Sequence, residues 1–134
     1  MLDIIKQRFA GIPDDCFENT LRGMEVISAD GGEVKIRLPV AKHLQNLGGV
    51  LHGGAIATLV DIAGTIAILT ADRQHRIGTS TDLNVSYFAP GSGVVLVEAR
   101  VLKSGKTLAF VTVEIRREAD QVLVAQGRMT KHMD

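Results

Sequence analysis

The sequence has 134 residues, which suits one domain with a substantial core and is too short for two, so we expect a single domain over residues 1–134. Lysine plus arginine and aspartate plus glutamate number 15 each, so no net charge is available to attract nucleic acid or an anionic membrane surface. The single cysteine, Cys16, excludes an internal disulfide, and no cysteine or histidine pair has metal-ligand spacing, so we expect a reducing compartment and no metal site.

Residues 2–10 are predicted to form a short amphipathic helix, with Leu2, Ile5 and Phe9 on one side. This segment has no apolar stretch long enough for a signal peptide, so we expect a cytoplasmic protein, with the mitochondrial matrix as the alternative. The segment that follows is expected to be a loop, with one helical turn as an option, that packs Phe17 against the core.

A hairpin is expected next. Its first strand runs from Leu21 to Ser28, and the turn covers residues 30–32. In the second strand, apolar residues alternate with Lys35 and Arg37, which predicts one face against the core and one face in water. The residues of the dry face are Val34, Ile36 and Leu38.

The stretch from Asn46 to Asp72 is the most informative part of the chain. It starts as a glycine-rich loop around His52 and continues as a run that is apolar on every face of a helix, so we expect a helix wrapped on nearly all sides. Asp61 is the only charge in this run, and burying a carboxylate is costly unless it is paired, so Asp61 is a functional candidate. Asp61 and glycines interrupt a length already minimal for a membrane span, which favours a core helix and no membrane insertion.

The remaining chain predicts three or four antiparallel strands. The first is expected from Thr79 to Phe88, with Leu83, Val85 and Tyr87 on one face; the polar face carries Ser80, Asp82, Asn84 and Ser86. The later strands lie in VVLVEARVLK, TLAFVTVEIRR and VLVAQGRMTK. Five or six strands and one long apolar helix predict an α+β fold in which a curved antiparallel sheet wraps around that helix.

The glycines at the expected helix start suggest a chemical role. Backbone N–H groups at Gly53 and Gly54 would lie unpaired at the positive end of the helix dipole, which suits an oxyanion, and the Asn46 amide could supply a second donor. Asp61 follows Gly53 by eight residues, about 12 Å along a helix. If both groups are catalytic, Asp61 must come from a second copy of the chain, which predicts a homodimer with two shared sites.

Several separated motifs occur in a recognisable order. Asn46, His52-Gly53-Gly54, Asp61 and the segment Ser80-Thr81-Asp82-Leu83-Asn84 together resemble the hotdog-fold thioesterases of the PaaI type. The segments LKSGKTLAF and AQGRMTKH are similar to the acyl-coenzyme A thioesterase thirteen branch of that family. The resemblance covers about residue 22 to the C-terminus and implies a hotdog fold, usually with dimers paired into tetramers.

On this resemblance we expect hydrolysis of an acyl-CoA thioester, with coenzyme A as part of the substrate and no separate cofactor. Gly53 and Asn46 would polarise the carbonyl, and Asp61 of the partner would act as general base or, as the less favoured alternative, as nucleophile. The resemblance implies that Ser80 helps to place the water, with Thr79 or Thr81 as substitutes. His52 is then expected to order the loop.

The resemblance also implies where the substrate lies. A medium- to long-chain fatty acyl group is expected in a pocket lined by residues such as Ile56, Val60 and Phe88, and an aryl group stays open. Natural phosphate partners are Lys103, Lys106 and Lys131. The full set of residues implied to contact the substrate or CoA is Ser80, Asp82, Tyr87, Phe88, Ala89, Pro90, Lys103, Ser104, Gly105, Lys106, Thr107, Leu108 and His132.

Other interpretations remain at this stage. Asp61 could be a hydrogen-bonded interface aspartate, the glycines could only allow close packing, and the lysines of residues 103–106 could be a solvated hairpin tip. A noncatalytic acyl-CoA binding or sensing module would keep the pocket without a base. An enoyl-CoA hydratase or dehydratase would need a histidine and a carboxylate on one substrate. His52 and Asp61 lie on opposite sides of the helix within one chain, although a dimer could bring them together.

Overall fold

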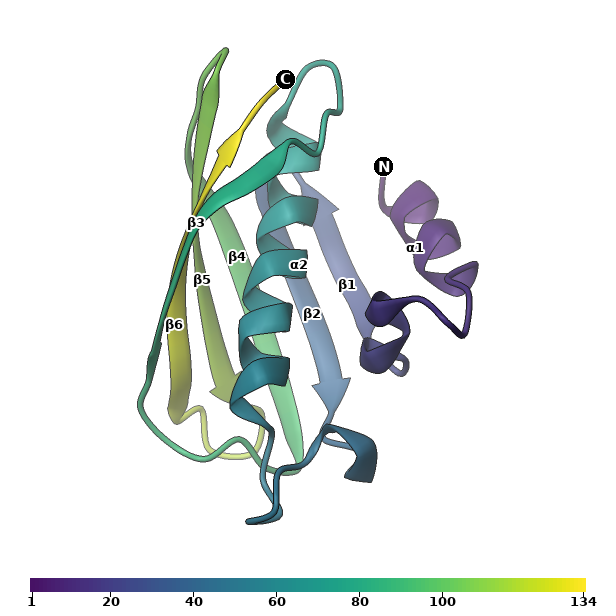
Figure 1. The fold of residues 1–134 in the computed structure, drawn as a ribbon, viewed down its shortest axis with the longest axis vertical. Helices are drawn as coiled ribbons and strands as arrows, with labels where there is room; N and C mark the ends of the chain where they lie inside the picture. The colour runs from purple at the N-terminus through teal and green to yellow at the C-terminus, as the bar shows by residue number, and fades with distance from the viewer.

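The computed structural model, which describes all 134 residues, contains one long helix lying against a six-stranded antiparallel sheet (Figure 1). The strand order is β1-β2-β4-β5-β6-β3, so β1 and β3 are the two edges. The predicted α+β fold is therefore confirmed. In chain order the elements are α1 (Leu2–Ala10), the 3-10 helix η1 (Phe17–Leu21), β1 (Glu25–Asp30), β2 (Glu33–Pro39), the 3-10 helix η2 (Lys42–Leu44), α2 (Gly53–Ala71), β3 (Thr79–Tyr87), β4 (Val94–Ser104), β5 (Leu108–Arg117) and β6 (Leu123–His132).

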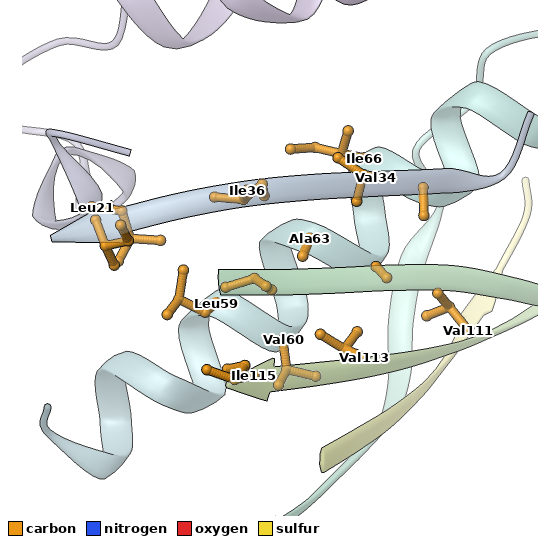
Figure 2. Packing of buried hydrophobic residues seen from close by; sticks show 14 of the residues in the cluster. Leu21, Val34, Ile36, Leu59, Val60, Ala63, Ile66, Val111, Val113 and Ile115 are labelled. Carbon is orange, nitrogen blue, oxygen red and sulfur yellow. The ribbon is translucent and has the colours of Figure 1, made fainter. Parts of the chain in front are cut away.

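The core lies between α2 and the inner face of the sheet. Alternating residues of β2, β4 and β5 face inward, as their sequence pattern predicts, and belong to one cluster of 28 buried hydrophobic residues. Figure 2 shows Val60 of α2 beside Val113 and Ile115 of β5. Burial of this apolar surface is the main stabilising contribution to the fold.

Two glycines allow α2 to approach the sheet closely. A Cβ atom at Gly127 of β6 would lie 2.6 Å from Val60 Cγ1, and a Cβ atom at Gly64 of α2 would lie 2.9 Å from Val111 Cγ1. Real Cβ atoms do not pack at such distances, so larger side chains would push the helix away. The middle of α2, which carries Asp61, is thereby held close to β6 and β3.

The N-terminal region differs from the prediction in two places. The first strand begins at Glu25 and not at Leu21, because Leu21 ends the 3-10 turn of residues 17–21 and Gly23 adopts a positive φ of 92° that interrupts extended backbone. The Phe17 side chain is 69% exposed, so the prediction that it packs against the core is wrong. The helix over residues 2–10 is confirmed, with Ile5 buried.

The expectation that α2 is wrapped on nearly all sides is also wrong for the single chain. By length and composition alone, α2 could cross a membrane. Only 50% of its most apolar 18-residue stretch is buried in the chain. The sheet covers one side, while α1 lies near the β1 edge and leaves a strip of α2 uncovered (Figure 1). The residues of this strip are only partly buried: Thr58, Asp61, Ile62, Thr65 and Leu69.

The C-terminal end of α2 is held by an ion pair. The Asp72 side chain is 6% exposed and accepts hydrogen bonds from the Arg76 guanidinium at 2.8 Å and from the backbone N–H groups of Gln74 and Arg76. Arg76 also donates to the carbonyl oxygen of Met133, which joins this loop to the end of the chain. The Arg76 hydrogen bond, with the backbone donors, lowers the pKa of Asp72 to about 2.

We expect Asp72→Asn to lower the free energy of unfolding at pH 7 by about 2 kcal/mol, because the depressed pKa measures the stability that the ionised carboxylate contributes. That contribution is complete above the unfolded pKa and is lost as the pH falls through the folded value, so the difference should shrink between about pH 4 and pH 2. Urea unfolding of both proteins at pH 7, 5 and 3 measures it. Asp120→Asn, which breaks the exposed pair with Arg117, is the control and should have a smaller effect; equal effects of the two variants at pH 7 would contradict the assignment.

Candidate active site

Of the two glycines at the start of α2, one presents a free backbone donor. His52 is the N-cap, and its Nδ1 accepts the N–H of Gly54 at 2.8 Å, so the ring proton of neutral His52 lies on Nε2. The N–H of Gly53 has no hydrogen-bond partner in the chain. The prediction of two unpaired glycine N–H groups therefore reduces to one, Gly53, because His52 occupies the other.

Asn46 is oriented by its own loop. Its Oδ1 accepts hydrogen bonds from the N–H of Gly48 at 2.9 Å and from the N–H of Val50 at 3.3 Å. Its backbone N–H in turn donates to the carbonyl oxygen of Val50. With both acceptor positions of Oδ1 used by the loop, the group that Asn46 has left to offer is the Nδ2 donor.

Tyr87, at the end of β3, contacts the start of α2. Its hydroxyl donates to the carbonyl oxygen of Gly53 at 3.0 Å, and its ring lies 3.5 Å from where a Cβ of Gly53 would be. The peptide between Gly53 and Gly54 is thus held by a hydrogen bond from the edge strand. Sequence reasoning missed this contact, since nothing in the pattern links Tyr87 to Gly53.

Asp61, in the middle of α2, is paired with Ser80 of β3. Ser80 Oγ donates to Asp61 Oδ1 at 2.9 Å and also lies 3.4 Å from the Sδ of Met129. Of the three hydroxyl residues considered from the sequence, only Ser80 makes this contact, and the Thr81 hydroxyl instead donates to the carbonyl oxygen of Thr130. Asp61 is half-buried, so its carboxylate is open to a ligand.

Strict alternation wrongly places Ser80 on the outer face of β3. A bulge lies between Ser80 and Asp82, so Ser80 pairs with Lys131 and Asp82 pairs with Thr130, while Thr81 is the extra residue. The extra residue moves the side chains that precede it in β3 to the opposite face of the sheet. Ser80 consequently shares the helix-facing side with Leu83, Val85 and Tyr87, which explains its contact with Asp61.

The two groups of polar residues do not meet within one chain. Gly53 and Asp61 belong to the same uninterrupted helix, and eight residues correspond to about 12 Å. His52 and Asp61 likewise form no pair, because His52 Nδ1 is bound to Gly54 and Asp61 is bound to Ser80. No three His, Cys, Asp or Glu side chains gather as a metal-binding group.

Lys131 of β6 lies beside Asp61 and is not a surface charge. It is 5% exposed, and its Nζ donates to the carbonyl oxygen of Ile77 at 2.8 Å. Burial lowers the pKa of Lys131, and the negative charge of Asp61 opposes that shift. The expectation that Lys131 meets a phosphate is therefore wrong, because its ammonium group points into the protein.

A groove of about 290 Å³ runs between α1 and α2 and includes Asp61 and Lys131; we call it the α1–α2 groove. The prediction that Ile56 and Val60 line an acyl pocket is wrong, because both side chains are buried against the sheet. The apolar residues that line the groove are Ile5, Phe9, Ile62, Ile66, Leu69 and Ile77. The sequence signal for it was the apolar side of residues 2–10, but the sequence does not say what that side faces.

The segments expected to contact CoA are exposed and lie at two ends of the sheet. Tyr87 pairs with Ala125, which pairs with Ile115, whereas His132 pairs with Leu108 at the other end of β5, roughly 23 Å away at strand spacing. The first end carries Phe88, Ala89 and Pro90; the second carries Lys103, Ser104, Gly105, Lys106 and Thr107 at the β4–β5 hairpin. Asp82 is exposed on β3, between the two ends.

Comparison with known proteins gives a consistent result. The family model described as "Thioesterase superfamily" matches residues 48–124. Human acyl-coenzyme A thioesterase 13 is 42% identical over 120 residues, which cover 87% of this chain and 84% of the relative. The mouse protein of the same name is 36% identical over 119 residues, again 87% and 84% of the two chains.

Solved structures give the same result for the fold. The crystal structure of zebrafish thioesterase superfamily member 2 superposes with a TM-score of 0.93 at 41% sequence identity, covering 100% of this chain and 99% of that one. The mouse thioesterase superfamily member 2 structure gives a TM-score of 0.85 at 32% identity, covering 99% and 94%. The predicted hotdog fold is confirmed by this agreement.

We expect His52→Ala to lower the free energy of unfolding by about 1 kcal/mol, the usual loss when an N-cap acceptor is removed. His52→Asn should restore most of it, because the asparagine side-chain oxygen can accept the N–H of Gly54. Urea unfolding of the three proteins measures the effect. Equal stability of wild type and His52→Ala would show that the cap contributes nothing.

Proposed function

The chain belongs to the thioesterase superfamily and is a thioester hydrolase, and on that premise we propose that it cleaves acyl-CoA with Asp61 as general base and Gly53 and Asn46 as carbonyl-polarising donors. The observation that carries this proposal is the contact between Ser80 Oγ and Asp61 Oδ1 at 2.9 Å. It fixes a half-exposed carboxylate on a helix whose start offers an unpaired N–H.

The donors are suited to the charge that develops on the thioester oxygen. The Gly53 N–H lies at the positive end of the α2 dipole, and the loop bonds to Asn46 Oδ1 leave Nδ2 to donate. Both groups are held by hydrogen bonds before substrate arrives, so little reorganisation accompanies the reaction. Gly53 has no side chain, which lets a carbonyl approach its backbone closely.

The Asp61 carboxylate activates a water molecule, which is the nucleophile. Asp61 accepts a proton from a water that Ser80 helps to hold, and the resulting hydroxide adds to the thioester carbon. The tetrahedral oxyanion then collapses with cleavage of the carbon–sulfur bond, and the proton returns to the CoA thiolate. The products are a carboxylic acid and CoA. A water-activating role needs only a carboxylate within hydrogen-bond reach, so we prefer it to nucleophilic attack by Asp61.

A complete site requires two chains. Gly53 and Asp61 of one chain are about 12 Å apart on α2, whereas reacting groups must come within about 3–3.5 Å. β3 is an edge strand with none of its nine residues buried, and its outer backbone groups have no partner. Pairing β3 with β3 of a second copy about a two-fold axis would cover this edge. We propose a homodimer with two shared sites, and further pairing of dimers into a tetramer.

The proposed substrate is a medium- to long-chain fatty acyl-CoA. The relatives named acyl-coenzyme A thioesterase 13 support the acyl-CoA class, and the apolar residues among those that line the groove beside Asp61 support a fatty acyl group. The exposed hairpin lysines, Lys103 and Lys106, would meet CoA phosphates. Because the predicted CoA segments lie at opposite ends of one sheet, we propose that a single CoA contacts them from more than one protomer.

The test is thiol release from a panel of acyl-CoAs. We expect Asp61→Asn to lower turnover at least about a hundredfold, because a positioned general base contributes roughly 10² to 10⁴. Ser86→Ala, a change on the outer face of the same β3 strand, is the control and should keep near-normal turnover. Light scattering checks that the oligomer is intact in each protein.

Retained turnover in Asp61→Asn would rule out the base, and wild-type protein that binds acyl-CoA without releasing thiol would rule out the reaction.

His52→Asn should keep turnover within a few-fold if His52 acts as a cap, since asparagine preserves the cap and removes the imidazole.

A further inference from the structure

Lys131 is a buried charge that the proposed chemistry does not use. The inner face of β6 carries buried apolar side chains such as Ala125 and Met129, and Lys131 interrupts this row with an ammonium group. Lys131 is 5% exposed, its Nζ donates to the carbonyl oxygen of Ile77, and no ion pair joins it to a carboxylate. Removing an ammonium group from water is costly, so packing alone would favour an apolar residue at this position.

The carbonyl oxygen of Ile77 does not by itself explain the lysine. Ile77 is 48% exposed and lies in the loop between α2 and β3, where a carbonyl oxygen can bind water. A water molecule would leave this loop free to shift relative to β6. The lysine differs from water in that it ties the loop to that strand.

Lys131 attaches the chain to β6 on both sides of a short link. Its side chain holds Ile77 and its backbone is the register partner of Ser80, so only two residues lie between the attachments. The first of these, Gly78, has a positive φ of 63°, and a Cβ atom there would lie 2.6 Å from the carbonyl oxygen of His132. The link therefore passes close over β6, at the end of the molecule that also carries the C-terminus (Figure 1).

Ser80 needs this attachment because the sheet holds it at few points. The bulge at Thr81 interrupts the ladder between β3 and β6 directly after Ser80. β3 is also an edge strand, so β6 is its only neighbour within the chain. Ser80 and Thr79 thus form a short end of the ladder, separated from the regular part of β3, and such ends fray unless another contact holds them.

We propose that Lys131 is a positioning residue for the hydrolysis, whose ammonium group holds the start of β3 so that Ser80 Oγ reaches Asp61. This inference rests on the proposed function, in which Ser80 and Asp61 hold the attacking water. The hydrogen bond between them is 2.9 Å long, and displacing such a group by about 1 Å can lower the rate on the order of a hundredfold. Lys131 acts on the reaction through Ser80 and does not touch the substrate.

Direct contact with the substrate is the competing role for Lys131. The residue lines the α1–α2 groove together with the charged side chains of Arg8, Glu18 and Asp61. Its burial and its hydrogen bond to Ile77, however, direct the ammonium group into the loop. Loss of a substrate-binding lysine raises KM, whereas loss of a positioning residue lowers kcat, so the two roles predict different kinetics.

The experiment is a double-mutant cycle between Lys131 and Ser80, with kcat and KM measured for decanoyl-CoA. Lys131→Met keeps the apolar stem and removes the donor. It should lower kcat at least about fivefold with KM within about twofold, whereas in the Ser80→Ala protein the same change should lower kcat less than about twofold. The effect disappears there because the hydroxyl that Lys131 positions is already absent.

Two further variants are controls. Asp72→Asn loosens the same loop from its other end, where Asp72 binds Arg76, and should change kcat by the same factor with and without Ser80→Ala. Lys35→Met removes an exposed lysine, which pairs with Glu98, and should leave kcat within about twofold of wild type. Circular dichroism verifies that each variant is folded.

Gly78→Ala provides a second reading if Lys131→Met does not fold, since its methyl group would displace the same link and its effect should depend on Ser80 in the same way. Equal effects of Lys131→Met with and without Ser80→Ala, a change in KM alone, or equal coupling for Asp72→Asn would overturn this inference and leave the thioesterase proposal standing. Ser80→Ala with wild-type kcat, or wild-type protein that releases no thiol, would instead contradict the proposed function, and this inference with it.

Discussion

The regular rise of α2 determines how the site can be built. One uninterrupted helix carries the free N–H of Gly53 at its first residue and the Asp61 carboxylate eight residues later, and 1.5 Å per residue keeps them about 12 Å apart. No side-chain rotation brings an N–H fixed in the backbone towards a carboxylate two turns away. If both groups act on one carbonyl, the chemistry depends on bringing a second helix alongside the first.

The surroundings of α2 hold each half of the site in place. Gly127 and Gly64 allow the helix to lie close to β6 and β5, so that Asp61 meets Ser80 of the neighbouring edge strand. At the other half, His52 accepts the N–H and Tyr87 donates to the carbonyl oxygen of the peptide between Gly53 and Gly54, so both polar atoms of that peptide are held. The contacts that stabilise the fold are thus also the contacts that orient the donors and the carboxylate, in the way expected of a preorganised site.

Much of this arrangement could be predicted from the sequence, and the failures have physical causes. The buried strands alternate as expected, and Asn46, Asp61 and Ser80 were identifiable by residue type and order. Ser80 was assigned to the wrong face because alternation assumes a regular strand, and one extra residue at Thr81 reverses the facing. Because β3 has few apolar residues, a bulge in it does not show as a break in the apolar pattern.

Burial was harder to predict than periodicity. The composition of α2 suggested a helix covered all round, but covering depends on where α1 and any second chain lie, which the sequence of α2 does not contain. Lys131 is predicted from the sequence as a phosphate partner, yet the carbonyl oxygen of Ile77 gives its buried ammonium group a partner inside the protein. The α1–α2 groove was invisible for the same reason, since it exists only between two elements far apart in the chain.

The measurement that tests the shared site most directly mixes two inactive variants. Asn46→Asp keeps an oxygen acceptor for the Gly48 and Val50 N–H groups and removes the Nδ2 donor, whereas Asp61→Ala removes the carboxylate. A dimer of one chain of each kind contains one intact site and one doubly defective site. Random mixing, verified by mass spectrometry, should restore about a quarter of wild-type thiol release from two chains that are inactive alone, since half the dimers are mixed and each has one good site of two. Mixed dimers that remain as inactive as their parents would contradict a site shared between chains.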